Sequence, residues 1–289
     1  MISSSKFKRR MKRTGIIMLI LLCLWTIMAQ SCMKFRISDE QAIEKFKKAG
    51  VALRIGRLKV NTRTLHYAKT GNDTLPTIVF VHGSPGAWDA FEAFMRDPIL
   101  LEKYRMISVD RPGFGYSDFG DAMNLQDQSM IIQPLFEKEQ NGKPVYLVGH
   151  SLGGPLIIQL AIDRPDFFDA LVILAGSIDP KQENPERWRP LLMNNPLKFL
   201  VPGAMRPSND ELWYLKKDLK DLAPQMDQIK ARVYIVHGDK DILVPYANLD
   251  FGVKAMKNAA FMDTLTIPGA NHFIPWSHYK TVRAVLLKL

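Results

Sequence analysis

The sequence is divided by short apolar runs, each followed at once by a polar segment that contains glycine. Thr77–Val81, Val145–Val148 and Val233–Val236 are three such runs. Uncharged runs of four or five residues suit strands that are buried on both faces, and longer stretches with helical character separate them. This alternation indicates an α/β protein with a mostly parallel sheet covered by helices on both faces. Ligands of such sheets bind beyond the carboxyl ends of the strands, which is where the polar segments fall.

Five further runs bring the predicted strands to eight: Leu58–Val60, Thr64–Ala68, Met106–Val109, Leu171–Leu174 and Thr264–Ile267. Before them, Ser38 and Gln41 have the spacing of a capping box, so we expect a short helix there that ends at Gly50. Between 177 and 230 prolines and tryptophans accumulate without a strand-like run, which predicts a helical insertion. The predicted domains are a signal over 1–31, a tether with its short helix over 32–56, a core over 57–176 and 231–289, and the insertion over 177–230.

The segment Gly149-His150-Ser151-Leu152-Gly153 carries the strongest chemical signal in the sequence. It has the pattern G-x-S-x-G, with an apolar run before it and a helix-forming run after it, which is the context of a nucleophile on a sharp strand-to-helix turn. Glycines are needed in such a turn because neighbouring backbone comes close to the serine. Ser151 is therefore the predicted nucleophile.

A serine hydroxyl is a weak nucleophile and needs a base that is oriented by a carboxylate. On this kind of sheet the chain order is serine, acid, histidine. His272 lies in the loop directly after an apolar run and is the predicted base, whereas His278 lies at the start of the last helix and is expected to have a structural or supporting role. Asp241 is the predicted acid. Its neighbour Asp239 is expected in a turn, and Asp179, after the preceding strand, is the alternative acid.

Negative charge that develops on the substrate oxygen needs backbone N–H donors. The residue after the nucleophile, Leu152, is expected to supply one of them. The second should come from the loop after Thr77–Val81, where Pro85 has no N–H, so Ser84 is the predicted donor. His82 is expected to stabilise this loop.

Five motifs in this order resemble those of the α/β-hydrolase superfamily: His82–Gly86, Asp110–Asp118, Gly149–Gly154, Gly238–Pro245 and Gly269–His272. The resemblance covers roughly residues 57–289. It implies an eight-stranded, mostly parallel sheet with a cap after the sixth strand, which matches the insertion at 177–230. It also implies a triad of Ser151, Asp241 and His272 and an acyl-enzyme route that requires no cofactor and no metal. A serine nucleophile departs from haloalkane dehalogenases and epoxide hydrolases, and argues against both activities.

The predicted function is hydrolysis of a carboxylic ester or related small acyl compound. Apolar cap residues such as Trp188, Leu191 and Leu215 either line its pocket or pack the cap onto the core. Acidic cap residues leave a peptidase similar to proline iminopeptidases as an alternative: Glu183, Glu186, Asp210 and Glu211. Acyl transfer and perhydrolysis are also compatible with this fold, and a binding protein without catalysis is the alternative from another class.

The net charge of +10 is concentrated at the start of the chain. Residues 1–31 contain six basic and no acidic residues, which leaves 33 basic against 29 acidic residues behind them, so no nucleic-acid partner is expected. The basic residues precede an apolar run, Gly15–Ala29, and together they form a secretory signal, with an uncleaved anchor as the alternative. Ala29-Gln30-Ser31-Cys32 resembles a bacterial lipobox. This resemblance implies a lipoprotein of the cell envelope, anchored to a membrane through Cys32.

Overall fold

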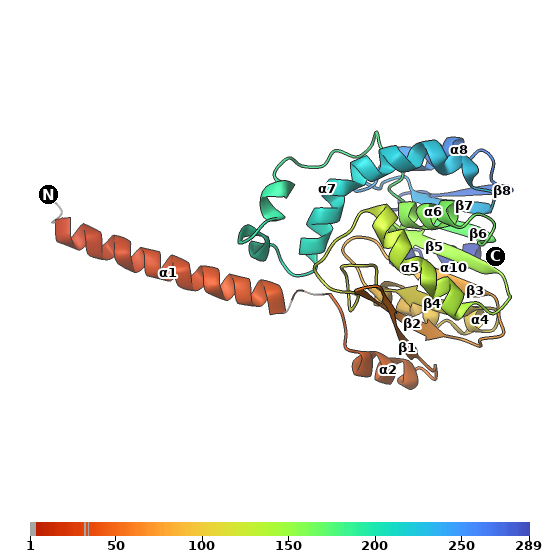
Figure 1. Ribbon diagram of the computed structural model, residues 1–289, viewed down its shortest axis with the longest axis horizontal. Coiled ribbons are helices and arrows are strands. Elements are labelled where there is room, and N and C mark those ends of the chain that lie inside the picture. The colour runs from red at the N-terminus through yellow and green to blue at the C-terminus, as the bar shows by residue number, and fades with distance from the viewer. Residues whose placement is uncertain (1–3, 32, 34) are drawn as a thin grey trace.

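The computed structural model describes residues 4–31, 33 and 35–289, and its centre is one eight-stranded sheet (Figure 1). The strand order is β1-β2-β4-β3-β5-β6-β7-β8, in which the β1–β2 and β2–β4 pairs are antiparallel and all pairs from β4 to β8 are parallel. The strands are β1 Arg54–Val60, β2 Arg63–Thr70, β3 Thr77–Val81, β4 Arg105–Val109, β5 Val145–His150, β6 Ala170–Leu174, β7 Arg232–Gly238 and β8 Phe261–Ile267. The predicted fold class, an α/β-hydrolase fold with a mostly parallel sheet, is confirmed.

Successive side chains of a strand point to opposite faces of the sheet. Each face carries its own apolar cluster and is buried under helices. In β5, Val145 and Leu147 join the apolar cluster under α5 and α6, whereas Tyr146 and Val148 join the cluster under α2, η1, α3, α4 and α10. The helices are α1 Ser4–Ser31, α2 Asp39–Lys48, η1 Trp88–Phe91, α3 Glu92–Met95, α4 Pro98–Leu101, α5 Leu125–Glu139, α6 Gly153–Asp163, η2 Arg189–Leu192, η3 Leu197–Leu200, α7 Met205–Leu222, η4 Ala223–Gln228, α8 Ala247–Ala255, α9 Ile274–Ser277 and α10 Tyr279–Leu286.

The edge strands differ most from the sequence prediction. β1 begins at Arg54, four residues before the predicted Leu58, and β2 extends to Thr70. No position of β1 is buried, and exposed and half-exposed residues are mixed along it. Strands of an antiparallel edge need no continuous apolar run, so a search for such runs finds only part of them.

Two segments extend beyond the helices that cover the sheet, although the first also adds Leu215, Leu219 and Leu222 of its longest helix to the cluster under α5 and α6. The cap segment, which we define as residues 177–230, connects β6 to β7 and contains η2, η3, α7 and η4. At the start of the chain, α1 extends away from the sheet (Figure 1), and its C-terminal half contacts η3. Over Lys6–Ser31 it is long and apolar enough to cross a membrane, a property that it shares with signal sequences. α2 begins with the predicted capping box, in which Ser38 and Gln41 bond reciprocally.

Candidate active site

The predicted site residues meet at one edge of the sheet. Ser84 follows β3, Ser151 follows β5, Asp241 follows β7 and His272 follows β8. Since these four strands are parallel, their carboxyl ends share this edge. The sheet thereby brings together residues that are far apart in the sequence.

Ser151 occupies the sharp turn between β5 and α6. Its φ is +55°, a left-handed conformation that residues with a side chain seldom adopt. The surrounding glycines allow the turn, because a Cβ at Gly149 would lie 2.3 Å from the carbonyl oxygen of Gly153, and a Cβ at Gly153 would lie 2.2 Å from that of Val81. Gly83 has the same role across the site, since a Cβ there would lie 2.9 Å from the Ser151 Cβ. The backbone around Ser151 is thus packed too closely for larger residues.

His272 is oriented by Asp241. Its Nδ1 lies 2.7 Å from Asp241 Oδ2, and the other carboxylate oxygen accepts hydrogen bonds from the backbone N–H groups of Leu243 (2.9 Å) and Val244 (2.8 Å). Burial raises the pKa of Asp241, but hydrogen bonds from His237, from His272 and from the backbone outweigh burial and hold this pKa below its usual range. The aspartate therefore remains charged beside the imidazole. Through Nδ1 the ring is fixed, which leaves Nε2 for chemistry.

The other candidate acids and the other candidate base lie apart from this pair. Asp239 Oδ1 accepts a hydrogen bond from the Gly269 N–H at 2.7 Å, the turn role that the sequence predicts. Asp179 Oδ1 accepts one from the Lys181 N–H at 2.8 Å. His278 is the N-cap residue of α10, and its Nδ1 lies 2.9 Å from the Ser277 hydroxyl. Of the three candidate acids, the one in contact with His272 is Asp241.

Ser84 and Leu152 both line the pocket that contains Ser151. Neither backbone N–H donates to another group in the described part of the chain. The Ser84 hydroxyl donates to the Ser208 hydroxyl of α7 at 2.8 Å, which ties this loop to the cap segment. His82 stabilises the loop: its Nε2 accepts from the Arg111 N–H (3.0 Å) and its Nδ1 lies 2.7 Å from the Gly83 carbonyl oxygen. Burial, together with the nearby Arg111, holds the pKa of His82 well below its usual range, so the ring is neutral.

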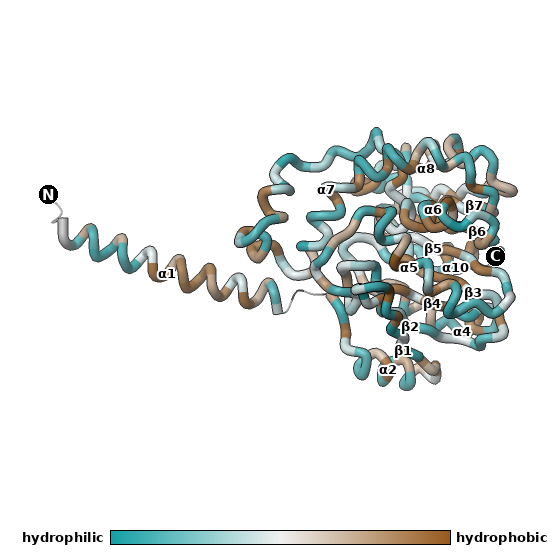
Figure 2. The backbone as a smooth tube through the Cα atoms, in the orientation of Figure 1, coloured by the Kyte–Doolittle hydropathy of each residue, from teal (hydrophilic) through white to brown (hydrophobic). Residues whose placement is uncertain are grey.

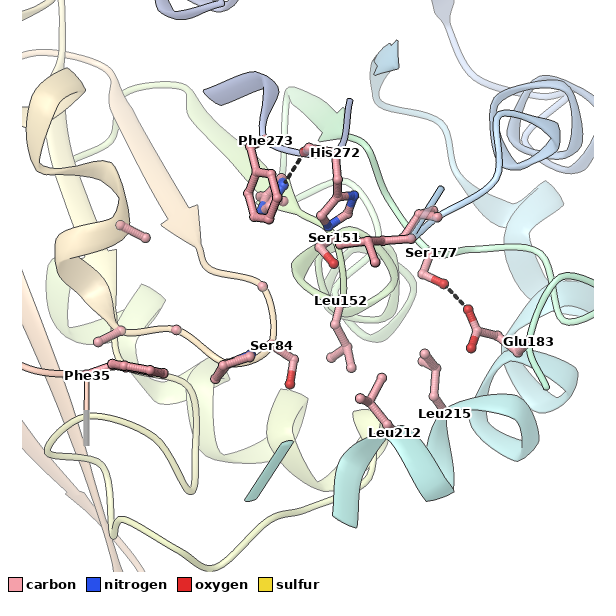
Figure 3. A pocket seen from close by; sticks show the side chains of 18 of the residues that line it. Phe35, Ser84, Ser151, Leu152, Ser177, Glu183, Leu212, Leu215, His272 and Phe273 are labelled. Atoms are coloured by element: carbon pink, nitrogen blue, oxygen red, sulfur yellow. Dashed lines mark hydrogen bonds between the residues drawn. The ribbon is translucent and has the colours of Figure 1, made fainter. Parts of the chain in front are cut away.

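A pocket of about 1070 Å³ opens in front of Ser151 (Figure 3). Core loops, the cap segment and the tether all contribute to its wall. In Figure 3, Phe35 of the tether and Glu183 of the cap segment lie on opposite sides of it. Among the apolar cap residues named from the sequence, Leu215 lines the pocket, whereas Trp188 and Leu191 are exposed outside it.

Sequence reasoning missed the role of His150. Its Nε2 lies 3.1 Å from the carbonyl oxygen of His272, and its ring packs edge-on against Trp276. Burial, reinforced by the neighbouring His272, lowers the pKa of His150 to about 3, so the ring is neutral and donates from Nε2. His150, the first variable residue of the G-x-S-x-G motif, thus holds the loop that carries the candidate base. In the sequence, the position of His150 directly before Ser151 was the signal that could have indicated a role in the site.

Sequence reasoning also missed a buried ion pair beneath the site. Arg111 donates from Nη1 to Glu211 Oε2 at 2.7 Å and from Nη2 to Glu211 Oε1 at 2.8 Å, and both side chains are buried. Nη2 also donates to the Gly83 carbonyl oxygen at 2.9 Å. This pair joins α7 to the loop that carries Ser84. The two residues are 100 positions apart, and no local pattern predicts such a pairing.

The acidic cap residues separate into two groups. Glu211 is paired with Arg111, and Asp210 accepts a hydrogen bond from the Asn209 side chain at 3.1 Å. Glu183 and Glu186, by contrast, line the pocket. Burial raises the pKa of Glu183, which accepts a hydrogen bond from the Ser177 hydroxyl.

Two further sequence predictions concern ligands. Over residues 4–31, 33 and 35–289 there is no cluster of three or more His, Cys, Asp or Glu side chains that could hold a metal ion. Cys32, the predicted lipidation site, lies outside the described residues.

Comparison with known proteins gives consistent relatives. A family profile described as alpha/beta hydrolase fold matches residues 76–200. An uncharacterised hydrolase of Bacillus subtilis, YugF, is 27% identical over 64% of this chain and 79% of its own length. A 2-hydroxy-6-oxononadienedioate/2-hydroxy-6-oxononatrienedioate hydrolase of Escherichia coli is 24% identical over 88% of this chain and 98% of its own. The crystal structure of a serine hydrolase from Cycloclasticus zankles superimposes with a TM-score of 0.64 at 14% identity and covers 81% of this chain and 96% of that one.

Proposed function

Because the chain has the α/β-hydrolase fold and is related to hydrolases of that fold, we propose that it is a serine hydrolase of carboxylic esters or related acyl compounds. Ser151 is the nucleophile, His272 the base and Asp241 the residue that orients His272. The observation that carries this proposal is the 2.7 Å contact between His272 Nδ1 and Asp241, next to a pocket that Ser151 also lines.

The reaction proceeds in two halves. His272 Nε2 takes the proton of the Ser151 hydroxyl as its Oγ attacks the acyl carbon, and the N–H groups of Ser84 and Leu152 stabilise the negative oxygen. His272 then protonates the leaving alkoxide, which leaves an acyl-Ser151 ester. Water, deprotonated by His272, attacks this ester and releases the carboxylic acid and free Ser151. Asp241 remains charged and stabilises the imidazolium in both halves.

A fluorophosphonate probe tests the nucleophile directly. The folded protein is expected to react through Ser151, and Ser151→Ala is expected to lose both labelling and at least about 10⁴-fold of kcat/KM on a short-chain aryl ester. Ser177→Ala, which removes another serine of the pocket wall, should still be labelled. Labelling of Ser151→Ala at the wild-type rate would overturn the proposal.

The charge of the pocket wall guides the choice of substrate. The Escherichia coli relative acts on a dioate, which carries two carboxylates. Here the wall contains the carboxylates of Asp89, Glu183 and Glu186 against the cations Arg36 and Arg189, and Arg189 already pairs with Glu186 at 2.6 Å. A wall with this balance favours an acyl compound without a second carboxylate.

Glu183 and Glu186 favour one further candidate, a peptidase that binds a substrate amine. The same preparation assayed on a proline arylamide separates the two activities. Preference for the arylamide over the aryl ester would assign the peptidase, and both activities require Ser151.

We also propose that the chain is exported and attached to a membrane as a lipoprotein. The basic run before Gly15–Ala29 and the lipobox-like segment ending at Cys32 support this assignment. Cleavage before Cys32 would leave its lipidated thiol as the attachment point, next to the tether at 33–38.

A further inference from the structure

Four large apolar side chains are exposed together on the cap segment. Trp188, Leu191, Leu197 and Phe199, which we call the cap face, are between 41% and 65% exposed. They lie on or next to η2 and η3, two short helices that pack against each other. Trp188 and Leu191 do not line the pocket in front of Ser151. Exposed apolar groups gathered in this way usually mark a surface that is covered in use.

The C-terminal half of α1 lies against this same part of the cap segment. Trp25 Nε1 donates to the Leu200 carbonyl oxygen at 2.9 Å, and Gln30 Nε2 donates to those of Phe199 (3.0 Å) and Val201 (2.8 Å). Between the two elements runs an apolar groove of about 600 Å³, lined by α1 from Leu22 onward and by residues 196–200. Figure 2 shows α1 as polar in its first half and apolar in its second.

The tether continues this contact toward the site. The Ala204 N–H donates to the Met33 carbonyl oxygen at 2.7 Å. Farther along, Arg36 Nη1 donates to the Gly115 carbonyl oxygen at 2.5 Å, and its guanidinium lies 4.2 Å from the centre of the Tyr116 ring. Phe35, Arg36 and Ile37 line the pocket. The place where the chain would leave a membrane is therefore held beside both the cap face and the pocket.

The length of α1 identifies what covers the cap face. Its apolar run, Gly15–Ala29, spans about 22 Å as a helix, and the hydrocarbon core of a bilayer is about 30 Å thick. The difference of about 8 Å matches the depth of about 5–10 Å to which an interfacial apolar face enters a bilayer. Basic residues at the opposite end, Lys6 to Arg13, suit a surface of lipid phosphates. With α1 inserted over this run, Trp25 and Gln30, which contact the cap segment, lie at the membrane surface, and this brings the cap face next to them to the lipid.

We propose that the cap face docks on the lipid bilayer and enters its outer layer beside α1. If the chain is cleaved before Cys32, the contacts of Met33 and Arg36 hold the attachment point in the same place, so the same face meets the bilayer. Because the tether lines the pocket, the pocket then opens next to lipid. This inference rests on the proposed function, and it identifies the substrates as acyl compounds dissolved in the membrane.

Docking is tested by the depth of a dye. In the full chain with Cys23→Ser and Cys32→Ser, Leu191→Cys is labelled with a nitrobenzoxadiazole dye and reconstituted into phosphatidylethanolamine and phosphatidylglycerol vesicles that contain doxyl lipid. We expect a blue-shifted emission that the doxyl group quenches. Phe261→Cys is the matched control, since Phe261 is 48% exposed at the start of β8, away from the site edge, and should remain unquenched. Equal quenching at both positions, or quenching at neither, would contradict docking. A blue-shifted emission at position 191 in detergent without lipid, caused by a second copy of the chain that covers the dye, would also contradict it.

Activity separates docking from the proposed function. Leu191→Asp with Phe199→Asp should lose at least tenfold of kcat/KM on an ester dissolved in vesicles and retain the wild-type value on a soluble short-chain ester. Phe261→Asp should retain both. If the wild type hydrolyses neither ester, the proposed function fails, and the dye still decides docking. If the double variant hydrolyses both esters normally, delivery through the cap face is wrong.

Discussion

At Asp241, burial and hydrogen bonding act on the pKa in opposite directions, and hydrogen bonding prevails. Two backbone N–H groups and an imidazole satisfy the carboxylate, so it stays ionised at any pH at which an imidazole titrates. His237 Nε2, at 3.5 Å from Asp241 Oδ2, is nearer to the Val244 carbonyl oxygen at 2.9 Å, so His272 makes the shorter of the two ring contacts. The charge of Asp241 is therefore directed mainly at the candidate base.

Asp241→Asn should reduce kcat by about 10³–10⁴-fold with little change in folding, because asparagine can still accept from the Leu243 and Val244 N–H groups but no longer stabilises the imidazolium. Steady-state kinetics on the aryl ester measure the loss. Asp239→Asn is the matched control two residues away and should stay within about twofold of the wild type. A larger loss in Asp239→Asn than in Asp241→Asn would reassign the acid.

At the scale of elements, a buried ion pair connects α7 to the loops that follow β3 and β4. Arg111 and Glu211 form two parallel hydrogen bonds in a buried setting, and Arg111 also binds the Gly83 carbonyl oxygen. Ser208 adds a contact to Ser84 from the same helix. The position of the predicted oxyanion donors thus depends on where the cap segment sits.

Glu211→Gln should lower the free energy of unfolding by about 3 kcal/mol, since it leaves the buried Arg111 without its counter-charge. Urea denaturation measures this change. The comparison is Glu186→Gln, which breaks the more exposed pair with Arg189 and should cost less than about 1 kcal/mol. Similar costs for the two variants would mean that the Arg111 pair does not fasten α7.

For the whole molecule, the main consequence of the fold is that the tether, which follows the proposed membrane anchor, lies beside the pocket. The tether is short and is bonded to the cap segment at Met33 and to the core at Arg36, so attachment to a membrane at the proposed position would also orient the pocket. Lipidation at Cys32 and retention of α1 would hold the chain at the same point.

Metabolic labelling with a fatty acid distinguishes these two forms of attachment. As a lipoprotein, the wild type and Cys23→Ser should both incorporate label, and Cys32→Ser should incorporate none, because the thiol that carries the acylated group is gone. Equal incorporation in Cys32→Ser and the wild type would show that Cys32 is not the modified residue.

Local patterns determined much of this protein before any coordinates. Short apolar runs identify the central parallel strands because those strands are buried along their whole length, and the glycines around Ser151 identify a turn in which nothing larger fits. The capping box at Ser38 is likewise local. The same reasoning shortened the partly exposed edge strands β1, β2 and β8, the last of which begins at Phe261 and not at Thr264.

Tertiary structure decided what depends on distant partners. The sequence favoured Asp241 as the acid, with Asp239 in a turn and Asp179 as the alternative, and the meeting of the β7 and β8 loops brings Asp241 into contact with His272. The His150 contact with the His272 carbonyl, the Arg111 pair with Glu211 and the docking of α1 on the cap segment join residues about 100 or more positions apart. Such pairings arise from packing of the whole chain, and neither residue type nor spacing encodes them.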